Sequence, residues 1–193
     1  MCKKLLITGF DPFGGETVNP AWEAVKLLPE SIGDYALCKL EIPTVFGVAA
    51  ETVLKKAAGF CPDVILCIGQ AGGRAAVTPE RIAVNIRDAR IPDNAGNQPD
   101  GERIAQDGPA AYFATVPVKE MAQAIRDAGI AATVSNSAGA FVCNDTLYSL
   151  LHHYAQTDVR VGFIHVPYLP EQGEPNMPLE TIAKALAAAI KAI

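Results

Sequence analysis

The sequence predicts an α/β fold, with helices on both faces of a mostly parallel, twisted sheet. Short apolar or β-branched runs alternate along the chain with longer segments of helical periodicity, which is the pattern of such a fold. Half of the 193 residues are hydrophobic and 19% are charged, a composition that excludes a disordered chain. A chain of this length buries about 70% of the surface that its unfolded form exposes, so its core needs no disulfide or metal. We expect residues 1–193 to form a single domain.

The expected strands are short apolar or β-branched runs bounded by polar or glycine-rich segments. The first run ends at Asp11 and Pro12 and no small-residue cleavage site follows it, so we expect a strand there and not a leader peptide. The predicted strands are Lys4–Thr8, Ala36–Ile42, Val64–Ile68, Arg81–Arg87, Ile130–Val134 and Arg160–Val166.

The expected helices repeat apolar residues every three or four positions. Asn19 is a suitable N-cap with Pro20 in the first turn, and Gly129 suits the position just after a helix. The segment 91–101 (IPDNAGNQPDG) is too rich in Pro, Gly, Asn and Asp for regular structure, so it is predicted to be a loop. The predicted helices are Pro20–Leu28, Phe46–Ala58, Val118–Ala128, Phe141–Tyr154 and Leu179–Ile193.

The charge and hydropathy patterns argue against nucleic-acid and membrane partners. The chain has 16 Lys and Arg against 21 Asp and Glu, a net charge of −5, and no basic run that would neutralise phosphates. The longest uninterrupted apolar run, Ala185–Ile190, is far shorter than the roughly 18 residues that a membrane-spanning helix needs.

Cysteine and histidine usage predicts a reducing compartment and no metal site. The five cysteines are odd in number and lack CxxC spacing, as is typical of free thiols in the cytoplasm. The three histidines form no HExxH motif and two of them are adjacent, so zinc would lack ligands. We therefore expect a cytoplasmic protein that uses neither a metal nor another cofactor. The cysteines are Cys2, Cys38, Cys61, Cys67 and Cys143.

Chemistry is expected beyond the carboxyl ends of the strands, where open α/β sheets bind their ligands. The segments that follow the predicted strands are rich in glycine, and one of them contains a cysteine. The GQAGGR segment could bind a phosphate, although it lacks the helix start and the downstream acid of a dinucleotide site. The segments are GFDPFGG (9–15), PTVFG (43–47), GQAGGR (69–74) and SNSAGAFVCN (135–144).

Cys143 is the candidate nucleophile. It precedes an amphipathic run, so we expect it in the first turn of a helix, where unpaired N–H groups and the helix dipole favour an anion. This position predicts a thiol pKa below the ordinary value of about 8.5. The alternative is a buried cysteine that packs as a small apolar residue, which is the interpretation kept for Cys38 and Cys67 inside strands.

His165 is the candidate general base, because it ends a strand at the same edge of the sheet and could take the thiol proton. The adjacent His152 and His153 lie about three turns into the predicted helix that begins near Cys143, which favours positions on the helix surface. A carboxylate should orient the imidazole. Glu80 follows the third strand and is the candidate, with a surface ion pair to Arg81 as the alternative.

Motifs spread over the whole chain are similar to those of a known family. They are ITGFDPFGG at 7–15 with Asn19 and Pro20, GQAGGR at 69–74, TPERIAVN at 78–85, PDNAGNQPDG at 92–101, SNSAGAFVCN at 135–144 and GFIHVPYLPEQ at 162–172. In these motifs the chain resembles pyroglutamyl peptidase I (pyrrolidone carboxyl peptidase), a family of cytosolic cysteine peptidases. The resemblance implies that Cys143 is the nucleophile, His165 the general acid/base and Glu80 the residue that orients it. It also implies that Arg90 and the Cys143 N–H hold the oxyanion.

The resemblance further implies a fold, an assembly and a substrate. The fold is a three-layer α/β/α sandwich of the phosphorylase/hydrolase-like kind, the assembly is a tetramer, and the substrate is a peptide with N-terminal 5-oxoproline (pyroglutamate). Because the lactam is uncharged, its pocket should be aromatic with amide partners; the alternative for Phe10 and Phe13 is a plain core position. Asp145 stands where relatives often have histidine. The implied substrate-binding residues are Phe10, Phe13, Asn19, Thr44, Gln70, Ile91, Phe141 and Val142.

The sequence therefore predicts a cysteine peptidase that releases N-terminal pyroglutamate through a thioester, without a cofactor. One alternative is a phosphate-dependent transferase of the nucleoside phosphorylase type, which would use GQAGGR for phosphate. Another is an inactive module that binds 5-oxoprolyl peptides without hydrolysing them. The sequence does not indicate whether the loop 91–101 closes over the ligand.

Overall fold

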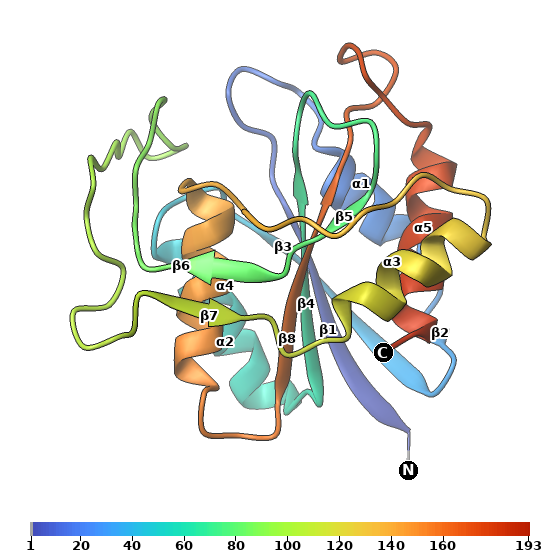
Figure 1. Ribbon diagram of the computed structural model, residues 1–193, viewed down its shortest axis with the longest axis horizontal. Helices are drawn as coiled ribbons and strands as arrows, with labels where there is room; N and C mark the ends of the chain where they lie inside the picture. Colours follow the sequence, from blue (N-terminus) through green and yellow to red (C-terminus); the bar gives the residue numbers. More distant parts are fainter. Residues whose placement is uncertain (1) are drawn as a thin grey trace.

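A six-stranded sheet forms the centre of the molecule in the computed structural model, which describes residues 2–193 (Figure 1). Its strands lie in the order β2-β3-β1-β4-β8-β5, and the four central ones are parallel. The two short edge strands pair antiparallel with their neighbours. The strands of this sheet are β1 (Lys3–Phe10), β2 (Ser31–Ile32), β3 (Tyr35–Ile42), β4 (Val64–Gln70), β5 (Thr78–Pro79) and β8 (Arg160–Val166).

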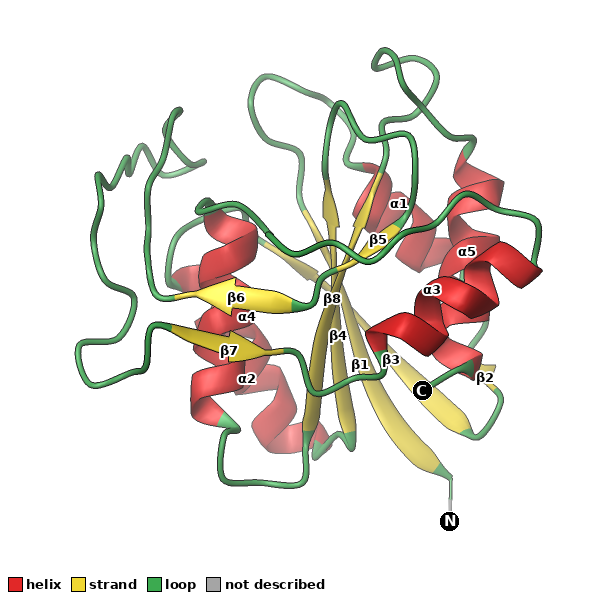
Figure 2. Cartoon of the chain, viewed as in Figure 1, coloured by secondary structure: helices red, strands yellow, loops and turns green. Residues whose placement is uncertain are grey.

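Helices cover both faces of this sheet because its central strands are apolar on both sides (Figure 2). Alternate residues of one strand enter different cores: Leu5 and Ile7 pack with α1, α3 and α5, whereas Leu6 packs with α2 and α4. Each face thus has its own hydrophobic cluster. The helices are α1 (Pro20–Leu27), α2 (Val48–Phe60), α3 (Val118–Asp127), α4 (Val142–His153) and α5 (Leu179–Lys191).

The predicted helices are confirmed, each within two residues at either end. The Asn19 side chain caps α1 by accepting a hydrogen bond from Ala21 N at 3.0 Å, and Pro20 is the first helical residue. Gly129 follows α3 with a φ of +79°, and its N–H donates to the Arg126 carbonyl. Local capping chemistry therefore sets these two ends, as expected.

The predicted strand Ile130–Val134 is wrong, and Pro79 gives the physical reason. This segment runs parallel to β5: Val77 N donates to Ala131 O, and Ser135 N donates to Pro79 O. A continuous ladder also needs the N–H of residue 79, which proline lacks. Pairing is therefore reduced to isolated bridges.

The predicted strand Arg81–Arg87 is only partly correct. β6 spans Ile82–Val84 and pairs antiparallel with β7 (Ala111–Phe113) in a separate two-stranded sheet. The short strands β2 and β7 carry too few residues to show an alternating pattern, so the sequence analysis did not identify them.

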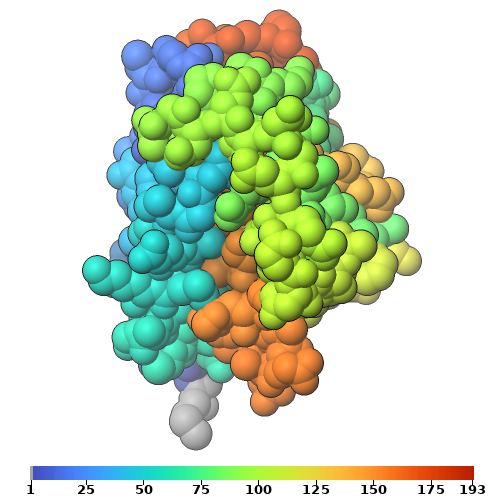
Figure 3. Space-filling view, turned by 90° about the vertical axis from the view of Figure 1, so that its left-hand side faces the viewer, coloured from blue at the N-terminus to red at the C-terminus, as the bar shows by residue number. Residues whose placement is uncertain are grey.

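The predicted loop 91–101 has no helix or strand, but hydrogen bonds hold it against neighbouring segments. Asp93, which is buried, accepts a hydrogen bond from Phe46 N at 2.9 Å. The Asn94 amide donates to the Pro12 carbonyl at 2.9 Å. Figure 3 shows the chain near this loop, in yellow-green, spread over the face beside α2. The loop thus links the segments that follow β1 and β3.

No helix within residues 2–193 is long and apolar enough to span a membrane.

Candidate active site

Three elements bring Cys143, His165 and Glu80 to the carboxyl end of the central strands. Cys143 is the second residue of α4, His165 lies near the end of β8, and Glu80 directly follows β5. Because β5 runs antiparallel to β8, Thr78 pairs with His165 and Glu80 N donates to Phe163 O at 2.9 Å. Residues two apart share a face of the sheet, so Glu80 lies on the same side as the His165 ring.

The thiol of Cys143 lies over Gly69, which is the register partner of His165 in β4. A Cβ atom at residue 69 would lie 3.0 Å from Cys143 Sγ and 2.8 Å from the ring of Phe163. The Phe163 ring centre is in turn 4.8 Å from that of His165. The Cys143 sulfur and the Phe163 ring therefore pack against a position that has room for glycine alone, and the imidazole lies on the Phe163 ring.

His165 and Glu80 form a buried hydrogen-bonded pair. The distance from His165 Nδ1 to Glu80 Oε1 is 2.7 Å, and the side chains are 4% and 0% exposed. An ionised carboxylate only accepts hydrogen bonds, so Nδ1 carries the proton and Nε2 remains as the basic nitrogen. This is the tautomer that a general base requires.

The predicted alternative for Glu80, a surface ion pair with Arg81, is wrong. Glu80 is fully buried, and its cationic partner is Arg74, whose Nη1 lies 2.6 Å from Oε1. Burial raises the pKa of the Glu80 carboxyl, but the hydrogen bond from His165 and the charge of its protonated imidazole, with smaller contributions from the Ser135 and Arg74 side chains, outweigh burial and leave this pKa below its ordinary value. Glu80 is therefore ionised at neutral pH.

The expectation of a lowered pKa for Cys143 is also wrong. Burial, the negative charge of Glu80 and the neighbouring Cys67 raise the pKa of the Cys143 thiol to about 12, although Arg74 and the helix N–H act in the opposite direction. Within residues 2–193 the thiol donates no hydrogen bond to the imidazole. The thiol is therefore neutral at neutral pH, and it would act as a nucleophile only with a base to take its proton.

The protonated thiol leads to a pH prediction for alkylation. Iodoacetamide should modify Cys143 about tenfold faster for each unit of pH from neutral to mildly alkaline solution, because the thiolate fraction rises tenfold per unit below the pKa. Peptide mass spectrometry would follow Cys143 separately from the exposed Cys2 and Cys61. A rate that is already level at neutral pH would show a preformed thiolate and contradict the raised pKa.

The packing around Gly69 leads to a second prediction. Gly69→Ala should lower kcat/KM about 100-fold. The added methyl group would push the Cys143 sulfur or the Phe163 ring aside, and such a shift misplaces the reacting groups. Gly59→Ala is the matched control: residue 59 lies in α2, and a Cβ atom there meets nothing within 4 Å. Equal kcat/KM for both variants would show that the site tolerates this displacement.

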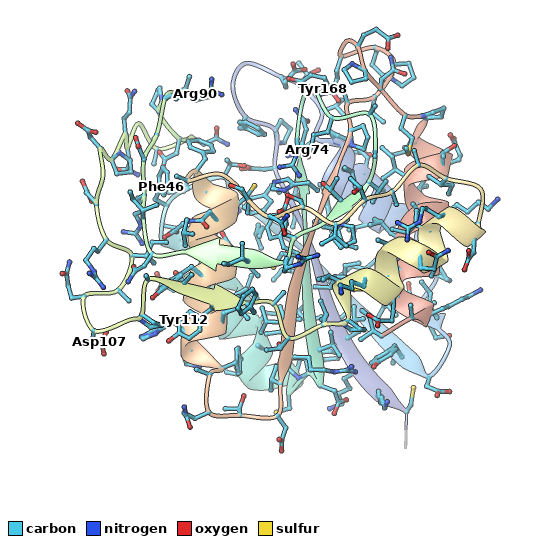
Figure 4. All side chains as sticks on the ribbon, viewed as in Figure 1. Phe46, Arg74, Arg90, Asp107, Tyr112 and Tyr168 are labelled. Carbon is cyan, nitrogen blue, oxygen red and sulfur yellow. The ribbon has the colours of Figure 1, made fainter. Side chains whose placement is uncertain are left out.

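A pocket of about 270 Å³ is lined in part by residues 139–141, which directly precede α4 and Cys143. The Phe13 and Phe141 rings, with centres 6.1 Å apart, form part of its wall, and Phe141 is the N-cap residue of α4. Four residues that the family resemblance implied for substrate or oxyanion binding therefore meet here. The complete lining is Phe13, Asp88, Arg90, Ile91, Gly139, Ala140 and Phe141. Figure 4 shows Arg90 on the outer loops, away from the central Arg74.

The other implied pocket residues make supporting contacts in this structure. Phe10 is 2% exposed and its ring centre lies 6.1 Å from that of Phe163. Asn19 uses its amide to cap α1 and to donate to the Asp11 carbonyl at 2.9 Å. Thr44 is buried, and its N–H donates to the Asp11 carboxylate. These residues hold the loop after β1 in place.

Gln70 and Val142 are the last two of the implied substrate-binding residues. The Gln70 Oε1 accepts a hydrogen bond from Gln172 at 3.2 Å, and Val142 is the fully buried first residue of α4. Asp145 is also buried: it accepts hydrogen bonds from Gly47 N and Arg87 Nε, each at 2.7 Å. Asp145 therefore ties the first turn of α4 to the segment before α2 and to Arg87.

Arg74 was not predicted as a site residue from the sequence. Its motif, GQAGGR, suggested a phosphate loop, but the structure uses the arginine side chain to bind Glu80. His152 and His153 lie in the last turn of α4, away from Cys143 in its first turn, and the Nδ1 atom of His152 lies 2.9 Å from the Tyr112 hydroxyl oxygen.

A cysteine in the first turn of a helix, an imidazole and an ionised carboxylate on one edge of an α/β sheet define a cysteine-type hydrolase. Comparison with known families agrees: residues 3–193 match the pyroglutamyl peptidase family, and the chain belongs to it.

Curated relatives and solved structures support this assignment. The pyrrolidone-carboxylate peptidases of Staphylococcus haemolyticus and Levilactobacillus brevis are 54% and 55% identical to the chain over 197 residues; each alignment covers 98% of this chain, and 93% and 97% of the relatives. The crystal structure of pyroglutamyl peptidase I from Bacillus amyloliquefaciens superimposes with a TM-score of 0.95 at 48% identity, covering 98% of this chain and 96% of that one. The pyrrolidone carboxyl peptidase of Thermococcus litoralis gives 0.93 at 39% identity, covering 98% and 92%.

Proposed function

We propose that this protein is a peptidase that removes N-terminal pyroglutamate from peptides, with Cys143 as nucleophile, His165 as general acid/base and Glu80 as the residue that orients the imidazole. The buried 2.7 Å contact between His165 and Glu80, on the same edge of the sheet as Cys143, carries this proposal. Residues 1–193 act as one catalytic domain. Its helices on both faces of the sheet support a three-layer α/β/α arrangement of the phosphorylase/hydrolase-like kind.

The first half of the reaction forms a thioester. His165 Nε2 takes the thiol proton while Cys143 Sγ attacks the 5-oxoprolyl carbonyl carbon outside the ring. The tetrahedral oxyanion is stabilised by the Cys143 N–H at the start of α4 and by Arg90 from the pocket wall. The C–N bond then breaks, and the imidazolium returns its proton to the leaving amine of the peptide.

The second half releases pyroglutamate. His165 takes a proton from water, whose oxygen attacks the thioester carbonyl, and the C–S bond breaks. The thiolate recovers the proton from the imidazolium, so the enzyme returns to its neutral resting state. The ionised Glu80 stabilises the imidazolium in both halves. No step requires a metal or another cofactor.

The pocket lined by Phe13, Ile91 and Phe141 is proposed to hold the lactam ring. Its aromatic side chains suit an uncharged, flat ring, and neighbouring amide groups would pair with the lactam N–H and C=O. Proline lacks that carbonyl, so a prolyl substrate would leave buried polar groups unpaired.

An assay with coumarin amides tests this function. Pyroglutamyl-coumarin amide should be cleaved, with kcat/KM up to about 10⁴-fold above that of the prolyl amide. Equal cleavage of the two amides would contradict a lactam-specific pocket. The family match gives no support to phosphorolysis or to an inactive binding module; phosphate-dependent turnover of a nucleoside, or binding of the pyroglutamyl amide without cleavage, would revive one of them.

We also propose a cytoplasmic homotetramer. This proposal rests on the family resemblance; Phe113, which is 68% exposed on β7, is an apolar side chain that contacts between copies would bury. Sedimentation velocity would detect the assembly, and a chain that stays monomeric at high concentration would contradict it.

A further inference from the structure

We propose that Arg74 is a positioning residue for this reaction: its guanidinium fixes the Glu80 carboxylate against His165 and binds the loop that leads to the nucleophile. This inference rests on the proposed peptidase function. It assigns a role to the last residue of GQAGGR, which the catalytic steps above do not use.

Arg74 and His165 share one oxygen of Glu80. Arg74 Nη1 and His165 Nδ1 lie 2.6 and 2.7 Å from the same atom, Oε1. The other oxygen, Oε2, is buried and accepts no hydrogen bond from any group between residues 2 and 193. The orientation of the carboxylate therefore depends on the donors at Oε1, and Arg74 is the only one of these two that stays charged throughout the reaction.

The same guanidinium has two further partners. Its Nη1 donates to Thr78 Oγ1 at 2.6 Å, which holds it against β5, and its Nη2 donates to the Ser137 carbonyl at 3.1 Å. Ser137 lies in the loop that leads into α4, whose second residue is Cys143. The planar guanidinium of Arg74 thus connects Glu80 with the loop that leads to Cys143. A lysine ammonium would keep the charge but not this fork of donors.

Arg74 also acts on the pKa values of both acidic groups, through its hydrogen bond to Glu80 and through its charge near Cys143. Burial favours a neutral Glu80, and the guanidinium helps to lower the pKa of the Glu80 carboxyl against that effect. It likewise opposes the rise in the pKa of the Cys143 thiol. Loss of Arg74 should therefore raise both pKa values and loosen the His165–Glu80 pair.

The test compares Arg74→Gln and Arg74→Lys with a control, Arg81→Gln. Arg81 is the sequence neighbour of Glu80, and within residues 2–193 only its backbone makes hydrogen bonds. Arg74→Gln should lower kcat about 100-fold with little change in KM, because the reacting groups move while the lactam pocket stays intact. Arg74→Lys should recover part of this loss, and Arg81→Gln should behave as the wild type.

The pH profile separates positioning from mere support of the fold. Activity needs ionised Glu80, so a raised Glu80 pKa moves the acid limb of kcat/KM to higher pH in Arg74→Gln. In Arg74→Lys, which keeps the charge, the limb should stay near that of the wild type. If Arg74→Gln matches Arg81→Gln, or loses activity only in proportion to its unfolded fraction by circular dichroism with an unmoved limb, the proposal is overturned.

A second readout does not depend on turnover. The His165 Nδ1–H, hydrogen-bonded to a carboxylate, should give a far-downfield proton resonance that shifts or broadens in Arg74→Gln and persists in Arg81→Gln. An unchanged resonance in Arg74→Gln would overturn the positioning role. If the wild type cleaves no pyroglutamyl amide, the proposed function fails on that result alone, and this resonance still decides the role of Arg74.

Discussion

Replacing Cys143 by alanine is expected to lower kcat for a pyroglutamyl amide by at least about 10⁴-fold, because the acyl intermediate forms on its sulfur. His165→Ala should cause a loss of similar size. Without the imidazole, the Cys143 thiol, whose pKa is raised to about 12, stays protonated at neutral pH. The double variant should be no slower than either single variant, since the two side chains act as one unit.

A matched thiol controls for general effects of removing a cysteine. Cys38 lies in β3, away from the site, and Cys38→Ala should keep wild-type activity. Circular dichroism would show that each variant is folded. Losses that multiply in the Cys143/His165 double variant would mean that the two residues act independently, which contradicts a thiol activated by this imidazole.

Glu80→Gln is expected to lower kcat about 10⁴-fold, the loss found when the orienting carboxylate of a hydrolase triad becomes an amide. Glutamine has the same shape, but it cannot stabilise the imidazolium by charge. Its amide group can also donate to Nδ1, which would favour the wrong tautomer of His165. The measurement is kcat on the pyroglutamyl amide at the pH optimum of the wild type.

Glu120→Gln is the control for Glu80→Gln, because Glu120 lies exposed in the first turn of α3. It should change kcat little. A Glu80→Gln variant that kept most of the wild-type kcat would show that the buried 2.7 Å contact serves the fold and not the reaction.

The sequence predicted most of the framework, because local signals determine it. Apolar periodicity located the helices, and Asn19 and Gly129 fixed two of their ends through capping. The strand Arg160–Val166 has the predicted bounds, since its apolar run is buried on both sides. The segment Ile130–Val134 failed because the missing N–H belongs to Pro79, about fifty residues away in the chain, and no local pattern reports such a partner.

The site was predictable only in part, because contacts between residues that are far apart in the chain leave no local sequence pattern. Cys143 and His165 stand at a helix start and a strand end, positions that sequence patterns can locate. The cationic partner of Glu80 could not be predicted from such patterns, because Arg74 and Glu80 do not lie on one helix or strand whose periodicity would bring them together. The pKa of Cys143 depends on burial and on Glu80 across the site, so the helix position alone gave the wrong direction.

The most direct test of the proposed thioester mechanism is a burst experiment with the 4-nitrophenyl ester of pyroglutamic acid, whose good leaving group makes deacylation the slow step. We expect a burst of one nitrophenolate per active chain, with a 5-oxoprolyl group recovered on the Cys143 peptide after acid quench. A burst that persists in Cys143→Ala, or an acyl group found on a different residue, would contradict it.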